Sequence, residues 1–131
     1  MSLHALPLRL NPGDDLRAAI EQVAHGHDAV YVLQGIGSLS GAMLRFAGRP
    51  HADAITGDLE ILTLAGTVSP DGAHLHMSVA DAQGRVVGGH VAPGCRVRTT
   101  AELLLAVLPG HAFGRAHDAA TGYPELTIRT V

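Results

Sequence analysis

The stretch HLHMSVADAQGRVVGGH, residues 74–90, contains two segments of alternating apolar and polar residues joined by the tetrapeptide DAQG. Alternation with a period of two is typical of β-strands that bury one face. The tetrapeptide fits a three-residue hairpin loop in which Gly84 adopts a left-handed conformation and forms a G1 bulge. This loop places Asp81 opposite Arg85 and thereby sets the register of the whole hairpin.

In that register His76 lies directly opposite His90, and His74 shares their face of the hairpin. Successive residues on one face are about 6.6 Å apart, and opposite residues have Cβ atoms about 5 Å apart, so the three imidazoles can converge. A two-residue loop, or a bulge at Gly88–Gly89, would shift the register by one and turn His90 toward the core. The other face is apolar and should meet the core; it carries Leu75, Met77, Val79, Val87, Gly89 and Val91.

Three neutral imidazoles on one face suit a divalent metal, since Zn²⁺ binds histidine nitrogen at about 2.0–2.1 Å. Three protein ligands leave one coordination position free for water or substrate, as in catalytic zinc sites. Gly88 and Gly89 are assigned to ligand binding because glycines would leave the opening uncrowded. Arg85, like Arg45, could recognise an anionic ligand near the histidines, or could belong to the solvated surface. The alternative is a half-buried polar face or histidines packed in a subunit interface. The candidate metal ligands are His74, His76 and His90.

Glu102 is the candidate catalytic carboxylate. It lies within the apolar run TAELLLAVL, where an unpaired charge would be costly. It could reach the histidines as a fourth ligand, a partner of a ligand or a general base, or it could pair with an arginine across the sheet or a subunit interface. Glu60, in DLEILTL, has the same apolar context and the same two readings.

The rest of the chain reads as strands with one clear helix. Residues 41–57 are ambiguous, a strand followed by a mobile loop, and residues 110–125 are mostly loop with room for one short strand. Residues 95–108 are interpreted as a strand, because a helix beginning at Thr99 would end about ten residues later at Pro109. Strands are predicted at residues 4–10, 28–39, 58–69, 95–108 and 126–130, and a helix at residues 16–26. Residues 1–131 thus form one α/β (α+β) domain, a largely antiparallel sheet of about seven strands with one or two helices.

Composition limits the partners of this chain. The net charge is −3, and the nine basic residues, all arginine, form no cluster that could displace counterions from DNA phosphates. Cys95 is the single cysteine, so no disulfide forms within the chain. The N-terminus has no signal-peptide pattern and no apolar run is long enough to cross a bilayer. We therefore expect a cytoplasmic protein without a membrane partner.

The chain resembles the plants-and-prokaryotes-conserved (PPC) domain family, in its prokaryotic single-domain form. The resemblance rests on LEILTLAGTVS, HLHMSVAD, GRVVGGHV and TTAELLL, and extends to LRLNPGDDL, GIGSL and FGRAHDAATGYPEL. It implies a homotrimeric α/β domain whose fold is similar to acetolactate decarboxylase, in which histidines hold the metal. Family members are also described as DNA-binding, a description that comes from plant relatives carrying basic AT-hook segments beside this domain.

Three hypotheses follow from the residues taken together with this resemblance, which alone implies the trimer. The first is a trimer with a divalent-metal or small-ligand site, acting, if an enzyme, as a metal-dependent lyase or hydrolase on a small oxygenated anion. The second is a regulatory module that meets DNA or protein partners. The segment AGRP, residues 47–50, lacks the flanking basic residues of an AT-hook and reads as a turn, so DNA binding by this chain alone is not expected. The third is a trimer whose histidines are purely structural.

Overall fold

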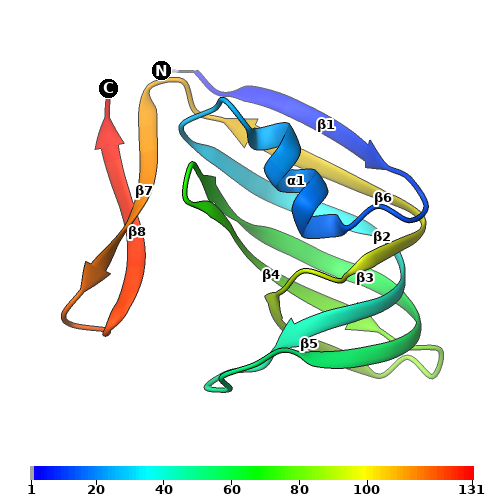
Figure 1. Ribbon diagram of the computed structural model, residues 1–131. Coiled ribbons are helices and arrows are strands. Elements are labelled where there is room, and N and C mark those ends of the chain that lie inside the picture. Colours follow the sequence, from blue (N-terminus) through cyan, green and yellow to red (C-terminus); the bar gives the residue numbers. More distant parts are fainter. Residues whose placement is uncertain (1) are drawn as a thin grey trace.

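A computed structural model describes residues 2–131 of the chain (Figure 1). The described residues contain eight strands and one helix. In chain order the elements are β1 (His4–Leu10), α1 (Leu16–Ala24), β2 (Val30–Arg45), β3 (Asp53–Ser69), β4 (Gly72–Ala80), β5 (Val86–Val91), β6 (Arg96–Val107), β7 (His111–Asp118) and β8 (Tyr123–Thr130). The predicted fold class is confirmed, since every strand pairing is antiparallel.

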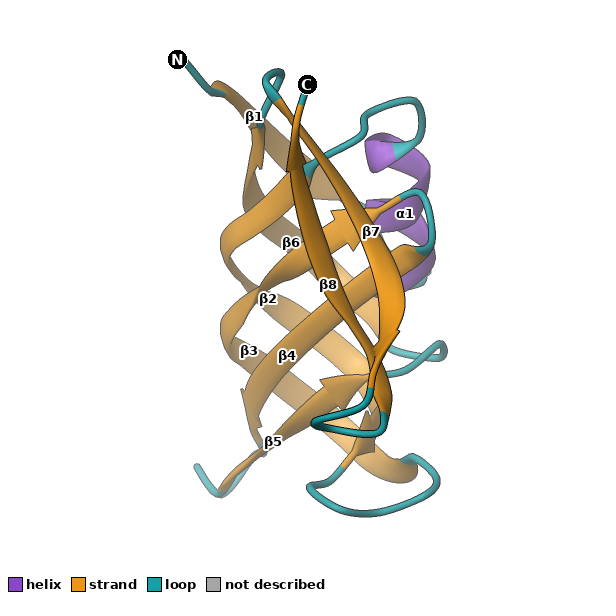
Figure 2. Cartoon of the chain, turned by 90° about the vertical axis from the view of Figure 1, so that its left-hand side faces the viewer, coloured by secondary structure: helices purple, strands orange, loops and turns teal. Residues whose placement is uncertain are grey.

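Six strands form the main sheet in the order β1-β6-β2-β3-β4-β5. The end of β2 also pairs with β5, with Leu44 opposite Val91 and Arg45 opposite His90, so that β2 to β5 close into a barrel-like ring. Figure 2 shows the strands of this ring crossing the molecule obliquely, with the β7–β8 hairpin running alongside as a separate two-stranded sheet. The closure of the ring brings Arg45 beside the third histidine.

Helix α1 covers an open side of the ring (Figure 1). Its N-cap is Asp15, whose carboxylate accepts hydrogen bonds from the backbone N–H groups of Ala18 and, on the β5–β6 connection, Gly94. Leu16 and Ile20 are fully buried, at the i, i+4 spacing that aligns one face of a helix. The helix has nine residues, and no helix within residues 2–131 is long and apolar enough to span a membrane.

The β4–β5 hairpin has the predicted register. Gly84 has φ +79° and donates its N–H to the carbonyl of Asp81 at 2.9 Å, as a G1 bulge requires. His76 pairs with His90 and Ser78 with Gly88. The predicted core face is buried at Leu75, Met77, Val79 and Val91. Val87 is an exception, 37% exposed, because the hairpin extends beyond the core toward its turn.

Strand β6 confirms the choice of strand over helix for the run AELLLAVL. It lies between β1 and β2, with Leu103 opposite both Leu8 and Gly35, so both of its edges are paired.

Two of the predictions for less regular segments were wrong. Residues 30–45 form one continuous strand rather than two segments, and residues 110–125 contain most of a hairpin rather than a loop. That hairpin is held by Phe113, which is buried and packs edge-on against Tyr31 with ring centroids 5.8 Å apart.

Candidate metal centre

The three predicted histidines gather on the outer face of the ring. His74 and His76 lie on β4 and His90 lies opposite His76 on β5. Their ring centroids are 5.0, 5.1 and 5.8 Å apart, and one nitrogen from each ring lies within 4.8 Å of the other two. The predicted convergence of the three imidazoles is therefore confirmed.

The donor set fits a divalent metal. Tetrahedral bonds of about 2.05 Å bring ligand nitrogens to roughly 3.3 Å from one another, so modest side-chain rotations would close the rings around an ion while the backbone register stays as it is. Among residues 2–131, none of the hydrogen bonds engages these imidazole nitrogens. His76 is exposed and the other two are half-buried, which leaves one side of the group open to a ligand.

Burial and nearby positive charges favour the neutral form of His74 and His90, the form that binds metal. Partial burial, followed by the charges of His74, Arg45 and Arg17, lowers the pKa of His90 to about 4. Partial burial, followed by the charge of Arg115, also lowers the pKa of His74 from its usual value. At neutral pH both rings can coordinate a metal without first losing a proton.

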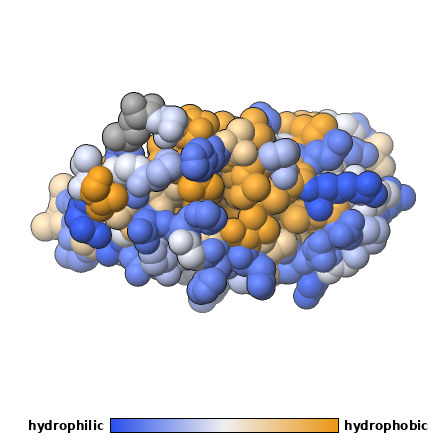
Figure 3. All heavy atoms as spheres, turned by 90° about the horizontal axis from the view of Figure 1, so that it is seen from above, coloured by the Kyte–Doolittle hydropathy of each residue, from blue (hydrophilic) through white to orange (hydrophobic). Residues whose placement is uncertain are grey.

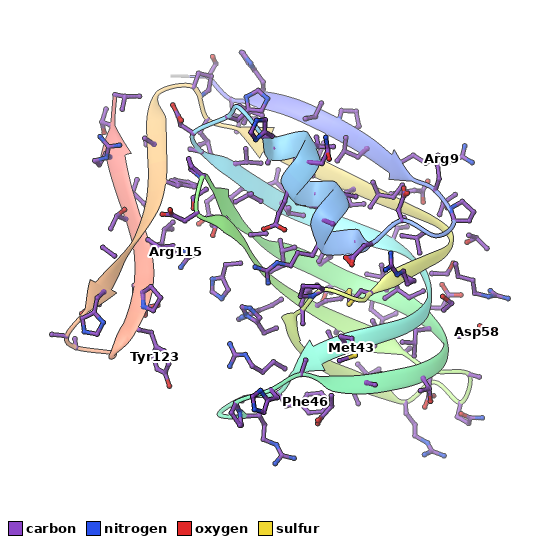
Figure 4. The ribbon with its side chains drawn as sticks, in the orientation of Figure 1. Arg9, Met43, Phe46, Asp58, Arg115 and Tyr123 are labelled. Carbon is purple, nitrogen blue, oxygen red and sulfur yellow. The ribbon has the colours of Figure 1, made fainter. Side chains whose placement is uncertain are left out.

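A cavity of about 770 Å³ lies beside His74 and His90. Its walls come from the β2–β3 connection, the β3–β4 turn and the β7–β8 hairpin, as well as from β2, β4 and β5. A second cavity, of about 630 Å³, contains His76 and shares His74, Arg115 and Glu125 with the first. The histidines thus lie on the side of the ring that faces the hairpin. Arg115 and Tyr123 extend from the hairpin in Figure 4 and border the larger cavity. The larger cavity suits a small-molecule ligand.

Arg115 and Glu125, which border both cavities, were missed in the sequence. Arg115 lies on β7 and Glu125 on β8, within the segment that was interpreted mostly as loop. The Arg115 side chain donates to Thr67 Oγ1 at 3.0 Å, and its backbone N–H donates to Asp71 Oδ2 at 2.8 Å. No sequence motif links residues 110–125 to the histidines. The two segments meet only because the β7–β8 hairpin packs beside the ring in the folded chain.

Glu102 does not lie beside the histidines. It is exposed on β6, opposite Arg9 of β1 and Ile36 of β2, and strands β2 and β3 separate it from β4. The alternation of β6 directs Glu102 outward while Ala101 and Leu103 point into the core. Glu60 lies near it, on the border of the same outer groove. Glu102 lies across the sheet from Arg9, but the ion pairs found within residues 2–131 do not include these two residues, so its pairing with an arginine stays a prediction.

Arg85 also lies away from the site. It is exposed in the β4–β5 turn, where its backbone N–H donates to Asp81 Oδ1, at the opposite end of the hairpin from the His76–His90 pair. Gly88 and Gly89 border neither cavity. A Cβ atom would lie 2.9 Å from the Met77 carbonyl oxygen at Gly88, and 2.7 Å from the Arg45 carbonyl oxygen at Gly89. These glycines permit close approach of neighbouring strands, and the reason given for them in the sequence, an uncrowded ligand position, was wrong.

Residues 2–109 match the model of the Plants and Prokaryotes Conserved (PCC) domain. The chain belongs to this family. The resemblance seen in the sequence is confirmed, and the three histidines lie within the PCC-matched residues. The β7–β8 hairpin, which supplies Arg115 and Glu125, follows the matched range.

Known proteins similar to this PCC domain include longer chains. The bifunctional protein GlmU of Synechococcus sp. strain JA-2-3B'a(2-13) is 48% identical over 132 residues, covering 99% of this chain and 21% of the relative. The GlmU of strain JA-3-3Ab is 49% identical over the same length. The chain therefore spans about a fifth of the length of these curated relatives.

Two solved structures share the fold closely. A hypothetical protein from Salmonella cholerae-suis is 37% identical, with a TM-score of 0.95 over 98% of this chain and 95% of its own. A metal-containing protein from Archaeoglobus fulgidus is 29% identical, with a TM-score of 0.82 over 95% of this chain and 93% of its own. The extent of the first match includes the β7–β8 hairpin, which is therefore not peculiar to this chain.

Proposed function

We propose that this PCC domain binds a divalent metal ion through His74, His76 and His90 and presents it to a small ligand in the adjoining cavity. The observation that carries the proposal is the group of three imidazole nitrogens within 4.8 Å, drawn from two paired strands. The name of the Archaeoglobus relative, a metal-containing protein, supports it. Zn²⁺ is the first candidate, because a site of three histidines with an open position suits it best.

The chemistry proposed for the site is that of a metal-dependent lyase or hydrolase acting on a small oxygenated anion. When bound, the metal would polarise an oxygen of the ligand or activate a water molecule. The chain itself contributes the imidazole ligands, the cavity walls and the positive charges of Arg45 and Arg115. Glu125, on the cavity wall, is the carboxylate placed to exchange a proton with a ligand, the role that Glu102 was expected to fill.

Elemental analysis of the protein purified without a histidine tag tests the metal site. After incubation with Zn²⁺ or Mn²⁺ and removal of free metal, we expect about one equivalent per chain. The double variant His76→Ala/His90→Ala should lose it, while His27→Ala, which changes an exposed loop histidine, should retain it. A wild-type content near zero that does not rise on incubation would contradict the proposal.

We also propose that the domain assembles as a homotrimer, as its family resemblance implies. Four large apolar side chains on the outer face of β2, β3 and β6 have no cover in the single chain. Their exposed fractions are 48% for Leu33, 51% for Ile36, 43% for Leu62 and 40% for Leu104. Figure 3 shows apolar atoms gathered in the middle of the face seen from above. Large apolar side chains left uncovered in the single chain are typical of subunit interfaces.

A further inference from the structure

Arg115 is an arginine without an acidic partner. Its side chain is half-buried between β7 and the ring, and its one hydrogen bond goes to a neutral hydroxyl, that of the buried Thr67. The ion pairs found within residues 2–131 join Arg17 to Glu21 and Arg98 to Asp58, so neither Arg115 nor Arg45 has a carboxylate within 4.0 Å. A guanidinium offers five N–H donors, and a partly desolvated one is costly unless an anion meets it.

The position of Arg115 is fixed by two contacts. Its backbone N–H donates to Asp71 Oδ2 at 2.8 Å, and its Nη2 donates to Thr67 Oγ1 at 3.0 Å. Thr67 is also the partner of His74 in the β3–β4 register, so the guanidinium is anchored next to the first histidine. Arginine held in this way loses little side-chain entropy when it binds a ligand.

A second free arginine borders the same cavity from the ring. Arg45 is the register partner of His90 at the end of β2, and its Nη1 donates to the carbonyl of Arg49 at 3.3 Å. Arg115 is thus anchored on Thr67, the strand partner of His74, and Arg45 is itself the strand partner of His90. Two guanidinium groups and the metal site therefore face one space of about 770 Å³.

We propose that Arg115, together with Arg45, forms a carboxylate-binding subsite, so that a small carboxylate in the cavity contacts both the Arg115 guanidinium and a metal held by the three histidines. This inference rests on the proposed metal site. The planar guanidinium fork matches a carboxylate in bidentate geometry. Asp71 and Glu125 on the same walls disfavour a doubly charged ligand, so a monoanionic carboxylate fits the charge of the cavity better than phosphate.

The test uses full-length, untagged protein loaded with Co²⁺, whose visible absorption responds to a change of ligand at the metal. Acetate and lactate are titrated in one arm and inorganic phosphate in the other. We expect Arg115→Gln to weaken carboxylate binding about tenfold, the loss of one charge-assisted hydrogen bond, with the Co²⁺ content unchanged. Arg45→Gln should weaken binding by a smaller factor in the same direction, because the side-chain hydrogen bond of Arg45 is exposed whereas that of Arg115 is partly buried. Arg129→Gln, an exposed arginine on the same hairpin that borders neither cavity, is the matched control.

The outcomes separate the two proposals. Wild-type protein that takes up no Co²⁺ would overturn the metal site and the subsite together. Full Co²⁺ content with carboxylate affinity unchanged in Arg115→Gln would overturn the subsite alone, as would an Arg115-dependent response to phosphate with none to carboxylates. If thermal unfolding shows that Arg115→Gln does not fold, the carboxylate affinity of Arg45→Gln tests the subsite in its place.

Discussion

Gly66 shows how the absence of a side chain at one residue can position a candidate metal ligand. A Cβ atom at this residue would collide with the carbonyl oxygen of His74 and lie 2.8 Å from the Cα atom of Leu75. The two strands can approach at this point because Gly66, the partner of Leu75 in the register, has no side chain. The position of the first histidine therefore depends on a residue that contacts no ligand.

Gly66→Ala is therefore expected to push β4 away from β3 and to displace His74. We expect a loss of about 1–3 kcal/mol in the free energy of unfolding, the cost of overpacking a tight contact, together with weaker metal binding. Chemical denaturation and metal titration measure the two effects. Gly41→Ala on β2 is the control, since its nearest neighbour would be 3.5 Å away, an ordinary contact. Equal stability of the two variants would contradict this account.

The lowered pKa of His90 predicts how the metal-free protein responds to pH. In the folded state His90 stays neutral down to about pH 4, whereas in the unfolded chain its pKa is near 6.5. Between these values the unfolded state binds more protons, so stability falls as the pH falls from 6.5 toward 4. Denaturation of metal-free protein at pH 7 and pH 5 should show this loss, and His90→Gln should show less of it. An equal pH dependence in both proteins would contradict the prediction.

At the residue scale, the sequence predicted the position of a side chain correctly where a rule about neighbouring residues applied, as in a hairpin turn. Gly84 in DAQG determined the hairpin turn, and the turn determined the register that brings His76 opposite His90. The prediction that Glu102 lies near the histidines failed. Its apolar neighbours were taken as a sign of burial, but along β6 they alternate between core and surface. The sequence also failed to predict the place of Arg115, whose proximity to His74 depends on how the hairpin packs against the ring.

Among the elements, the β7–β8 hairpin joins the ring through few contacts. Phe113 is 6% exposed and packs against Tyr31, while its partner across the hairpin, Ile128, is 60% exposed. Backbone hydrogen bonds from Phe113 to Asp28 and from Arg115 to Asp71 complete the attachment. Phe113 therefore supplies the aromatic contact of the attachment, while the hydrogen bonds of Arg115 to Asp71 and Thr67 supply polar contacts.

Phe113→Ala should loosen the hairpin without removing a histidine ligand. We expect a loss of about 3 kcal/mol in the free energy of unfolding, typical of a buried phenylalanine, and faster proteolysis of residues 111–130. Metal content should remain near that of the wild type. Ile128→Ala, the matched exposed partner, should change neither stability nor proteolysis. Loss of metal in Phe113→Ala would mean that the hairpin helps to hold the histidines themselves.

The same elements show the limits of prediction from sequence. Strands β1, β3, β4 and β6 and helix α1 were predicted because their apolar residues follow a clear period. The period is weak in residues 110–125, where glycine, alanine and histidine dominate, and the strands there are formed by pairing with each other. The continuity of β2 past Gly41 could not be foreseen either, because it depends on pairing with three other strands.

At the scale of the whole molecule, the uncovered apolar face predicts assembly. Leu62→Glu places a charge on the β3 side of the face formed by β2, β3 and β6, and we expect it to dissociate the proposed trimer. Light scattering should give the wild type a mass near three times 13.5 kDa and the variant a mass near that of one chain. Val86→Glu, at the exposed tip of the β4–β5 hairpin, is the control and should remain trimeric. A monomeric wild type would contradict the proposed assembly.

The pairing of β2 also has a consequence for how the chain folds. The first residue of β2, Val30, pairs with Val107 at the end of β6, while the last, Arg45, pairs with His90. As the chain leaves the ribosome, β2 emerges long before these partners exist and exposes unpaired backbone edges in the meantime. Folding must then wait for the closure of large chain loops, which makes it slow. The edge of β2 that later pairs with β6 and β5 is therefore the strand edge most exposed to aggregation in the nascent chain.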